Sequence, residues 1–262
     1  MEHTESLETT HEGTESGIAV HLAPEAVGYV FGVPLTNTLL TVWLVMAVLI
    51  GVALLLRKRL RLVPSKVQTS AEALVGGGYD YVKEVLESEE YARRFFPLIA
   101  TIFIFILGIN WIGLLPGIDA IGVYHESHGA MKLVPFFHPG NTDLNITFAF
   151  AIVAFVSIEI AGVLIVGMAK YSKKFINFSS PLNFIIGIIE LLSELARLIS
   201  FSFRLFGNIF AGKMLLLVAL FFVPFVLPVP LMAFELFVGL IQAFIFAILT
   251  LFFVKLAIEE PH

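Results

Sequence analysis

An arginine lies inside a long apolar stretch of this sequence, SFSFRLFGNIFAGKMLLLV (200–218). Arginine keeps its positive charge in any protein environment, and placing a cation at the centre of a bilayer costs about 2.5–3.5 kcal/mol on insertion scales. Arg204 has no acidic residue three or four positions away on either side, so the same helix supplies no counter-ion. We expect Arg204 to act electrostatically on an ionisable group that lies elsewhere.

Other polar residues recur along the same helical segment. At 100° per residue, Arg197, Arg204 and Asn208 fall within about 60° of one another, and Glu190 and Ser193 join that side. The whole stripe consists of Glu190, Ser193, Glu194, Arg197, Ser200, Arg204 and Asn208. Two interpretations stay open for its first part: Glu190, Glu194 and Arg197 belong either to a functional polar path or to ordinary ion pairs at i,i+3 and i,i+4 spacing.

The last apolar segment carries Glu235 and Gln242, which are seven residues apart and therefore share one helical face, with Gly239 between them. Gln242 is either a site residue or a buried amide that binds a neighbouring backbone group. Lys213 either contributes to a site or extends its ammonium group to the membrane surface. Glu159 is isolated among Ile, Ala and Val, and the two interpretations, site residue or half of a structural pair, both stay open for it.

The composition indicates the setting of these residues. The chain is 58% hydrophobic and only 14% charged, with a mean hydropathy of +0.93, whereas a soluble domain carries about a quarter charged residues. It contains no cysteine, which excludes disulfides, zinc thiolates and iron–sulfur sites. The sequence therefore predicts a polytopic membrane protein embedded in a lipid bilayer, without cofactor or metal and without nucleic acid as a partner.

The elements that position these residues follow from the apolar runs, because about 20 apolar residues suffice to cross a bilayer as a helix. We predict an all-α membrane protein whose single membrane domain (35–262) follows a polar N-terminal tail (1–34). An amphipathic interfacial helix is expected at about 66–90. The last two spans exceed the bilayer thickness and should form a tilted hairpin. The five spans are predicted at about 35–56, 95–115, 144–169, 181–223 and 231–258.

The distribution of Lys and Arg predicts the orientation of the chain. Residues 1–34 contain none, the segments 57–94 and 170–174 together contain eleven, and the loop between the second and third spans contains only Lys132. With five crossings, the N-terminus is expected outside and the C-terminus in the cytoplasm of a bacterial plasma (inner) membrane. The acidic tail has no apolar core and does not read as a signal peptide.

Three motifs resemble one protein family. FRLFGNIFAGKMLL (203–216) looks like the signature of subunit a of the F-type ATP synthase membrane sector, with its Arg-Leu-Phe-Gly-Asn core. LIQAFIFAILTLFFV (240–254) resembles the last helix of that family, and NWIGLLPG (110–117) resembles the end of its second span. The resemblance extends from about residue 35 to the C-terminus.

This resemblance implies a proton-translocating stator subunit that is no enzyme by itself. Such a subunit lies beside a ring of c subunits, is joined to the b-subunit peripheral stalk, and offers one aqueous half-channel to each side of the membrane. On matching positions, Arg204 separates the half-channels and promotes deprotonation of the c-ring carboxyl, while Gln242 and Asn208 surround it. The resemblance assigns Glu190 and Ser193, with Glu194 beside them, to the inner path.

Lys213 and Glu235 depart from the pattern of several relatives, which carry a carboxylate and a histidine at these positions. The two residues would form a charge pair across the outer half-channel. Two other classes of protein fit this sequence less well. A stand-alone transporter would show internal repeats, which are absent from the sequence. A metalloenzyme could use His125, His128 and His138, but their spacing is not that of a zinc protease, and segment 122–141 reads as an exposed loop.

Overall fold

Five long helices dominate the computed structural model, and each is long and apolar enough to cross a membrane. The structure describes residues 24–30, 32–59, 64–115, 117–118, 121–127, 130–175, 180–224 and 226–259. Most of the predicted polar tail lies outside these residues. The predicted all-α membrane fold with five crossing helices is confirmed by the long helices α1 (Asn37–Arg59), α3 (Glu89–Ile112), α4 (Leu144–Val166), α6 (Pro181–Phe222) and α7 (Pro228–Ile258).

The starts of three of these helices follow from side-chain caps. Ser88 accepts a hydrogen bond from the backbone of Tyr91 at the start of α3, and Asp143 accepts one from Asn145 at the start of α4. Ser180 caps the start of α6. Pro181 follows as the first helical residue, where the fixed backbone angle of proline suits the first turn. The same tolerance lets α7 begin at Pro228, three residues before its predicted start.

Several predicted boundaries differ from the structure. The second span begins at Glu89 and ends at Ile112, rather than running over about 95–115. The segment 66–90 holds not one helix but α2 (Lys66–Leu86) and the start of α3, because Glu87 takes the left-handed conformation at φ 52° and Ser88 begins a new helix. The third span ends at Val166 rather than 169, since Gly167 at φ 92° turns the chain into the short helix α5 (Met168–Phe175). Glycine is the residue that adopts such a positive φ at least cost.

Two small antiparallel hairpins were missed by the sequence analysis. The first pairs β1 (Ala26–Val30) with β2 (Val33–Thr36), directly before α1. The second pairs β3 (Gly122–Ser127) with β4 (Ala130–Pro135), where an exposed loop was expected. Val and Tyr in these strands favour extended backbone, but His, Glu and Gly among them concealed the pattern. A 3₁₀ turn, η2 (Gly140–Thr142), then leads into α4.

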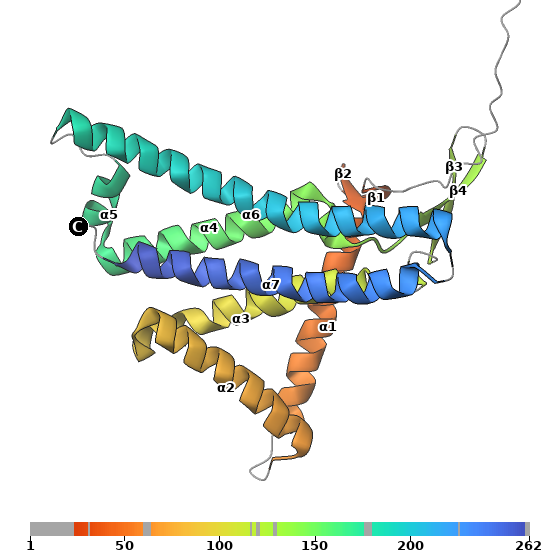
Figure 1. Cartoon of the computed structure of the whole chain (residues 1–262), viewed down its shortest axis with the longest axis horizontal. Coiled ribbons are helices and arrows are strands. Elements are labelled where there is room, and N and C mark those ends of the chain that lie inside the picture. Colours follow the sequence, from red (N-terminus) through yellow and green to blue (C-terminus); the bar gives the residue numbers. More distant parts are fainter. Residues whose placement is uncertain are drawn as a thin grey trace, which may run out of the picture.

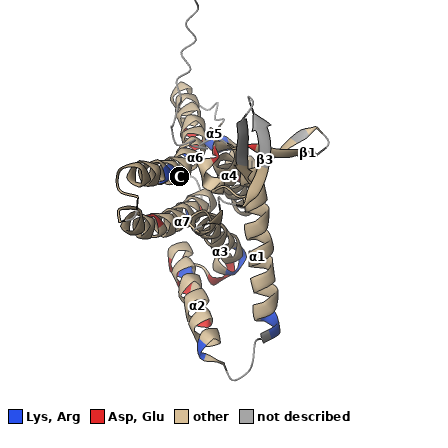
Figure 2. Ribbon diagram, turned by 90° about the vertical axis from the view of Figure 1, so that its right-hand side faces the viewer, with Lys and Arg blue, Asp and Glu red and all other residues tan. Residues whose placement is uncertain are grey.

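Helices α6 and α7 run antiparallel side by side, as the predicted hairpin requires, and α3 and α4 pack along them (Figure 1). Helix α1 crosses this group, and α2 folds back against α3 (Figure 1). Lys and Arg gather at the end of α1 and the beginning of α2, whereas the middle of α1 is free of charge (Figure 2). The inclination of the hairpin to the membrane normal stays a prediction.

Two contacts define the register of the α6–α7 hairpin. The rings of Phe201 and Phe246 lie 4.9 Å apart between centroids, and the carboxyl group of Glu235 lies against Gly212. Eleven residues separate the two contacts on each helix, so the antiparallel register is constant between them. Phe201 and Phe246 belong to a buried apolar cluster contributed by α3, α4, α6 and α7. This cluster holds the middle of the hairpin in place.

Candidate functional site

Arg204 and Gln242 occupy the same level of the hairpin. Three residues after Phe201 on α6, the register sets Arg204 opposite Ala243, the neighbour of Gln242 on α7. Both side chains are half-buried. Arg204 Nη2 donates a hydrogen bond to Ser200 Oγ over 3.4 Å, and Asn208 Nδ2 donates one to the backbone oxygen of Arg204 over 3.0 Å. Within the part of the chain that the structure describes, the Arg204 guanidinium has no carboxylate partner.

A second polar group, which we name the Lys174 cluster, consists of Lys174, Glu190, Glu194 and Arg197. Lys174 Nζ lies 2.8 Å from Glu190 Oε1 and 3.1 Å from Glu194 Oε1, and Arg197 Nη1 lies 2.6 Å from Glu194 Oε2. Glu194 is only 2% exposed. The guanidinium of Arg197 also stacks over the ring of Phe253 at 3.8 Å, a favourable cation–π contact.

The Lys174 cluster favours ion pairing for Glu194, which was one of the two open interpretations. No pattern in the sequence indicated Lys174 as a member of this cluster, because this lysine comes from a different helix, α5, which packs against α6. Burial opposes the charge of Lys174, but the hydrogen bonds to Glu190 and Glu194 and the negative charges of these two residues together outweigh burial and raise the pKa of Lys174. Ser193 lies beside the cluster with an exposed side chain, and its Oγ donates to the backbone oxygen of Ile189.

The third polar group lies near the other end of the hairpin. Glu235 is buried with its carboxyl group directly against Gly212, and among the described residues its Oε1 has no hydrogen-bond partner. Lys213, the next residue on α6, lies on the wall of the same cavity of about 280 Å³, the Glu235 cavity. Other residues that line this cavity include Asn110, Pro139, Ile209 and Met232.

The expected charge pair between Lys213 and Glu235 is not formed. Instead, Lys213 Nζ lies 3.0 Å from Nδ1 and 3.2 Å from Nε2 of His138. His138 is 2% exposed, so the prediction of an exposed loop is wrong for this residue. The contact joins residues 75 positions apart, so no local pattern could reveal it. In the part of the chain that the structure describes, no three His, Asp or Glu side chains are grouped to hold a metal ion.

A hydrogen-bonded amide network holds α7 against its neighbours at this level. Asn141 Nδ2 donates to Asn110 Oδ1 over 2.6 Å, and Asn110 Nδ2 donates to the backbone oxygen of Gly239 over 2.9 Å. Gly239 leaves room for this approach, since a methyl group there would press on Asn110 at 3.0 Å. Trp111 Nε1 donates to the backbone oxygen of Leu236. The network fixes the position of the helix that carries Glu235 and Gln242.

Glu159, left undecided from sequence, pairs with a residue beyond the end of its helix. Tyr171 Oη donates a hydrogen bond to Glu159 Oε2 over 3.0 Å, and the Tyr171 ring lies directly on Gly162. Burial, together with the nearby Glu159 carboxyl, raises the pKa of Tyr171 far above its usual value. The phenol therefore stays protonated and acts as the donor. This pair attaches α5 to α4.

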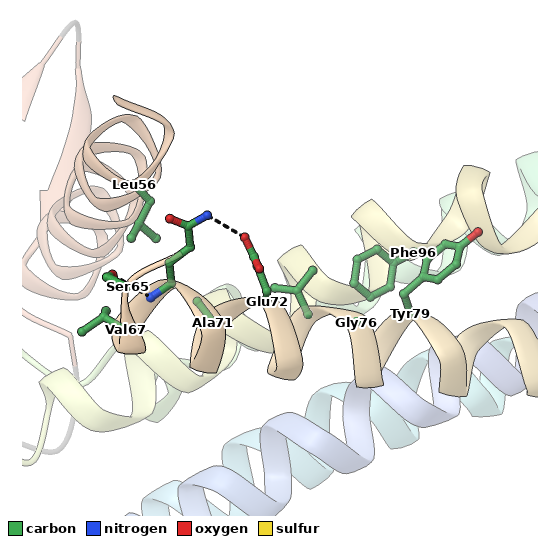
Figure 3. Close-up of a pocket in the computed structure, with 10 residues that line it drawn as sticks. Leu56, Ser65, Val67, Ala71, Glu72, Gly76, Tyr79 and Phe96 are labelled. Carbon is green, nitrogen blue, oxygen red and sulfur yellow. Dashed lines mark hydrogen bonds between the residues drawn. The ribbon is translucent and has the colours of Figure 1, made fainter. Parts of the chain in front are cut away.

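A cavity larger than the Glu235 cavity lies elsewhere. A groove of about 660 Å³ is enclosed by the end of α1, the first half of α2 and the start of α3, with Leu56, Val67 and Phe96 among its apolar walls (Figure 3). Its acidic residue, Glu72, accepts a hydrogen bond from Gln68 over 2.8 Å (Figure 3). None of the buried polar residues of α6 and α7 lines this groove, so we locate the candidate site at the hairpin.

The comparisons with known proteins decide the family. The sequence model of the family described as "ATP synthase A chain" matches residues 39–255. The chain belongs to this family. It is 34% identical over 223 residues to ATP synthase subunit a of Geotalea daltonii, covering 84% of this chain and 86% of that protein. It is 31% identical over 234 residues to ATP synthase subunit a of Moorella thermoacetica, covering 89% and 96% of the two chains.

Membership of the ATP synthase A chain family confirms the resemblance drawn from the three motifs. The chain is a multi-pass membrane protein of bacterial type, a non-catalytic component of the membrane sector that serves proton transport and ATP synthesis. The matched region contains all three polar groups of the hairpin and its surroundings. Their individual roles are the subject of the proposal below.

Proposed function

We propose that the chain is the stator subunit that couples proton flow to rotation of a c-subunit ring in an F-type ATP synthase. It would offer two half-channels, one beginning at the Glu235 cavity and one at the Lys174 cluster, with Arg204 between them. The observation that carries this proposal is the isolation of Arg204: this half-buried cation has no carboxylate partner among the described residues. A partner carboxyl is therefore expected on another subunit.

The spacing along α6 supports two separate half-channels. Arg204 lies fourteen residues from Glu190 and nine residues from Lys213, which corresponds to about 21 Å and about 14 Å along a helix. Protons cannot pass between the two polar groups through Arg204, because its guanidinium stays protonated. Arg204 would therefore prevent a proton leak between the half-channels as well as bind the incoming carboxylate.

The mechanism follows from the charge of each group. A proton enters the Glu235 cavity, passes by way of Glu235 and neutralises a c-ring carboxylate, which then rotates through lipid. When that carboxyl meets Arg204, the cation favours its ionised form, and the proton leaves along Glu190 and Ser193. Gln242 and Asn208 keep Arg204 in a polar surrounding. Glu194, held by Lys174 and Arg197, would support the inner path by fixing its walls.

The exposed face of α6 supports contact with a partner in the membrane. Beside Arg204, this face carries large apolar side chains without cover from the rest of the chain, among them Leu192, Leu195, Ile199 and Phe203. A c ring would cover this face, and the b-subunit stalk would bind elsewhere on the chain. The N-terminus is placed outside and the C-terminus in the cytoplasm, on the Lys and Arg bias alone.

Replacement of Arg204 tests the proposal. Arg204→Ala should abolish ATP-driven proton pumping in membrane vesicles while assembly of the complex stays largely intact. Arg204→Lys should restore little, because lysine lacks the planar fork of arginine and is more strongly hydrated. Arg93→Ala is the matched control, since Arg93 is exposed and pairs with Glu89 on its own helix. Substantial coupled pumping by the Ala variant would exclude Arg204 from the mechanism.

A further inference from the structure

The contact between His138 and Lys213 has no role in the mechanism above. An ammonium group can donate hydrogen bonds but cannot accept them, so the ring nitrogen of His138 that carries no proton, Nδ1 at 3.0 Å or Nε2 at 3.2 Å, acts as the acceptor. The ring must be neutral at that atom while Lys213 carries the charge, because two cations at 3.0 Å repel each other. The pair therefore holds one positive charge at the wall of the Glu235 cavity.

His138 is held firmly by its neighbours. Its backbone N–H donates a hydrogen bond to Thr41 Oγ1 on α1 over 3.0 Å. The next residue, Pro139, packs onto Gly113 at the end of α3, where a methyl group would lie 2.6 Å from the proline ring. His138 is thus anchored to α1 and α3, whereas Lys213 belongs to α6. The contact fixes the direction of a long, flexible side chain from outside its own helix.

The Glu235 carboxyl is the group most affected by where Lys213 points. It lies against Gly212, one residue from Lys213, and its Oε1 is buried without a hydrogen-bond partner in the described structure. The charged or titratable groups described around this carboxyl are Lys213 on α6 and His138 before η2; Asp143 at the start of α4 is bound to Thr38. A lysine released from His138 could reach Glu235 and form a direct ion pair.

We propose that His138 is a positioning residue, which binds the Lys213 ammonium and so prevents a direct Lys213–Glu235 ion pair that would oppose protonation of Glu235. This proposal rests on the proposed function of the Glu235 cavity in proton uptake. A directly paired cation within about 4–6 Å favours the charged form of a carboxyl by roughly 1–3 pH units. Without His138, Glu235 would accept protons only at a more acidic pH.

The test uses the assembled complex in proteoliposomes. ATP synthesis is measured at a fixed membrane potential and fixed pH on the ATP side, while the pH of the proton-supplying compartment is varied. In His138→Leu, the pH at which the rate is half-maximal should move by about one pH unit toward acidic pH. His138→Gln, whose amide oxygen also accepts a hydrogen bond, should retain a profile close to that of the unaltered protein. Rates are normalised to assembled complex.

A double variant separates positioning from a structural role. If His138 acts through Lys213, then His138→Leu should not alter the pH profile of the Lys213→Met protein. An equal acidic shift in that background would overturn the proposal, as would a profile of His138→Leu that coincides with the unaltered protein. His138→Met, which conserves most of the side-chain volume, replaces the Leu variant if that chain fails to assemble.

A second readout does not depend on transport. Carbodiimides react with protonated carboxyl groups, so labelling of Glu235 at one fixed pH, read from its own peptide, should fall in His138→Leu and recover in His138→Gln. Unchanged labelling would contradict the proposal. Arg204→Ala is measured in parallel: retained coupling in that variant refutes the proposed function, whereas lost coupling together with an unaltered His138→Leu profile refutes only the role of His138.

Discussion

The carboxyl group of Glu235 on α7 lies directly against the Cα of Gly212 on α6, with no space for even a methyl group between them. Gly212 is helical, so glycine serves here to admit a neighbour rather than to permit an unusual backbone conformation. The contact sets the level of Glu235 within the hairpin and orients it into the cavity that Lys213 also lines. The spacing of α6 and α7 at this point therefore depends on two residues.

Replacing Gly212 with alanine should displace the Glu235 side chain, because the added Cβ would overlap both carboxyl oxygens. On the proposed function, proton transport should fall at least tenfold, although alanine is the better helix former by about 1 kcal/mol. Proton pumping per assembled complex is the measurement. Gly51→Ala on α1 is the control, since a Cβ there meets nothing within 4 Å. Equal activity of the two variants would show that the position of Glu235 is unimportant.

The register of the hairpin predicts a crosslink. Cysteines introduced at Arg204 and Gln242 into this cysteine-free chain should form a disulfide under mild oxidation, because the register sets the two positions at one level of neighbouring helices. Cysteines at Phe203 and Gln242 are the control, as the Phe203 side chain is 55% exposed on the outer face of α6. The measurement is a mobility shift after oxidation. If only the control pair formed a crosslink, the sides of α6 and α7 that we infer to face each other would be wrong.

Local patterns predicted the long helices and residues that share a helix face, such as Arg204 and Asn208 on α6, since apolar periodicity depends on neighbours within a few turns. The same patterns missed the break at Gly167. A single glycine in an apolar run is compatible with a continuous helix, and the turn there depends on how α5 packs against α4 and α6.

Contacts between distant segments account for the rest of what was missed. His138 reaches Lys213 across 75 positions, and Lys174 reaches Glu194 across 20. Neither contact produces a periodic pattern in the sequence, because each joins residues from two different elements. The sequence identified Lys213, Glu235 and Glu194 as polar residues in apolar surroundings, but their partners required the packed structure.

Loss of the Tyr171 hydroxyl should destabilise the attachment of α5 to α4. Tyr171→Phe removes the hydrogen bond to Oε2 of the half-buried Glu159. The loss of a hydrogen-bond partner typically costs about 1–3 kcal/mol for a buried group and less for a half-buried one. Thermal unfolding of the purified chain in detergent is the measurement, with Tyr81→Phe on the exposed side of α2 as control. In a Glu159→Ala background the same change should cost little. A similar loss in both backgrounds would mean that the hydroxyl acts independently of Glu159.

The Lys174 cluster predicts a stability effect with a defined pH dependence. Lys174→Met would leave the buried Glu194 carboxylate paired with Arg197 alone. The free energy of unfolding should fall, but by less than the roughly 3–5 kcal/mol seen when a buried ion loses its only partner. Lys173→Met is the matched control, because Lys173 is the preceding residue and its side chain is exposed.

The sign of the pH dependence follows from the raised pKa of Lys174. The ordinary lysine value is 10.5, so the unfolded chain releases this proton before the folded chain does. The stabilisation by Lys174 is therefore fully present below about pH 10.5 and is lost as pH rises through the folded value. Thermal unfolding of the unaltered and Lys174→Met chains should differ equally at pH 7 and pH 9, and the difference should shrink at higher pH. A difference that instead disappears on acidification to pH 6 would assign the effect to a group other than the Lys174 ammonium.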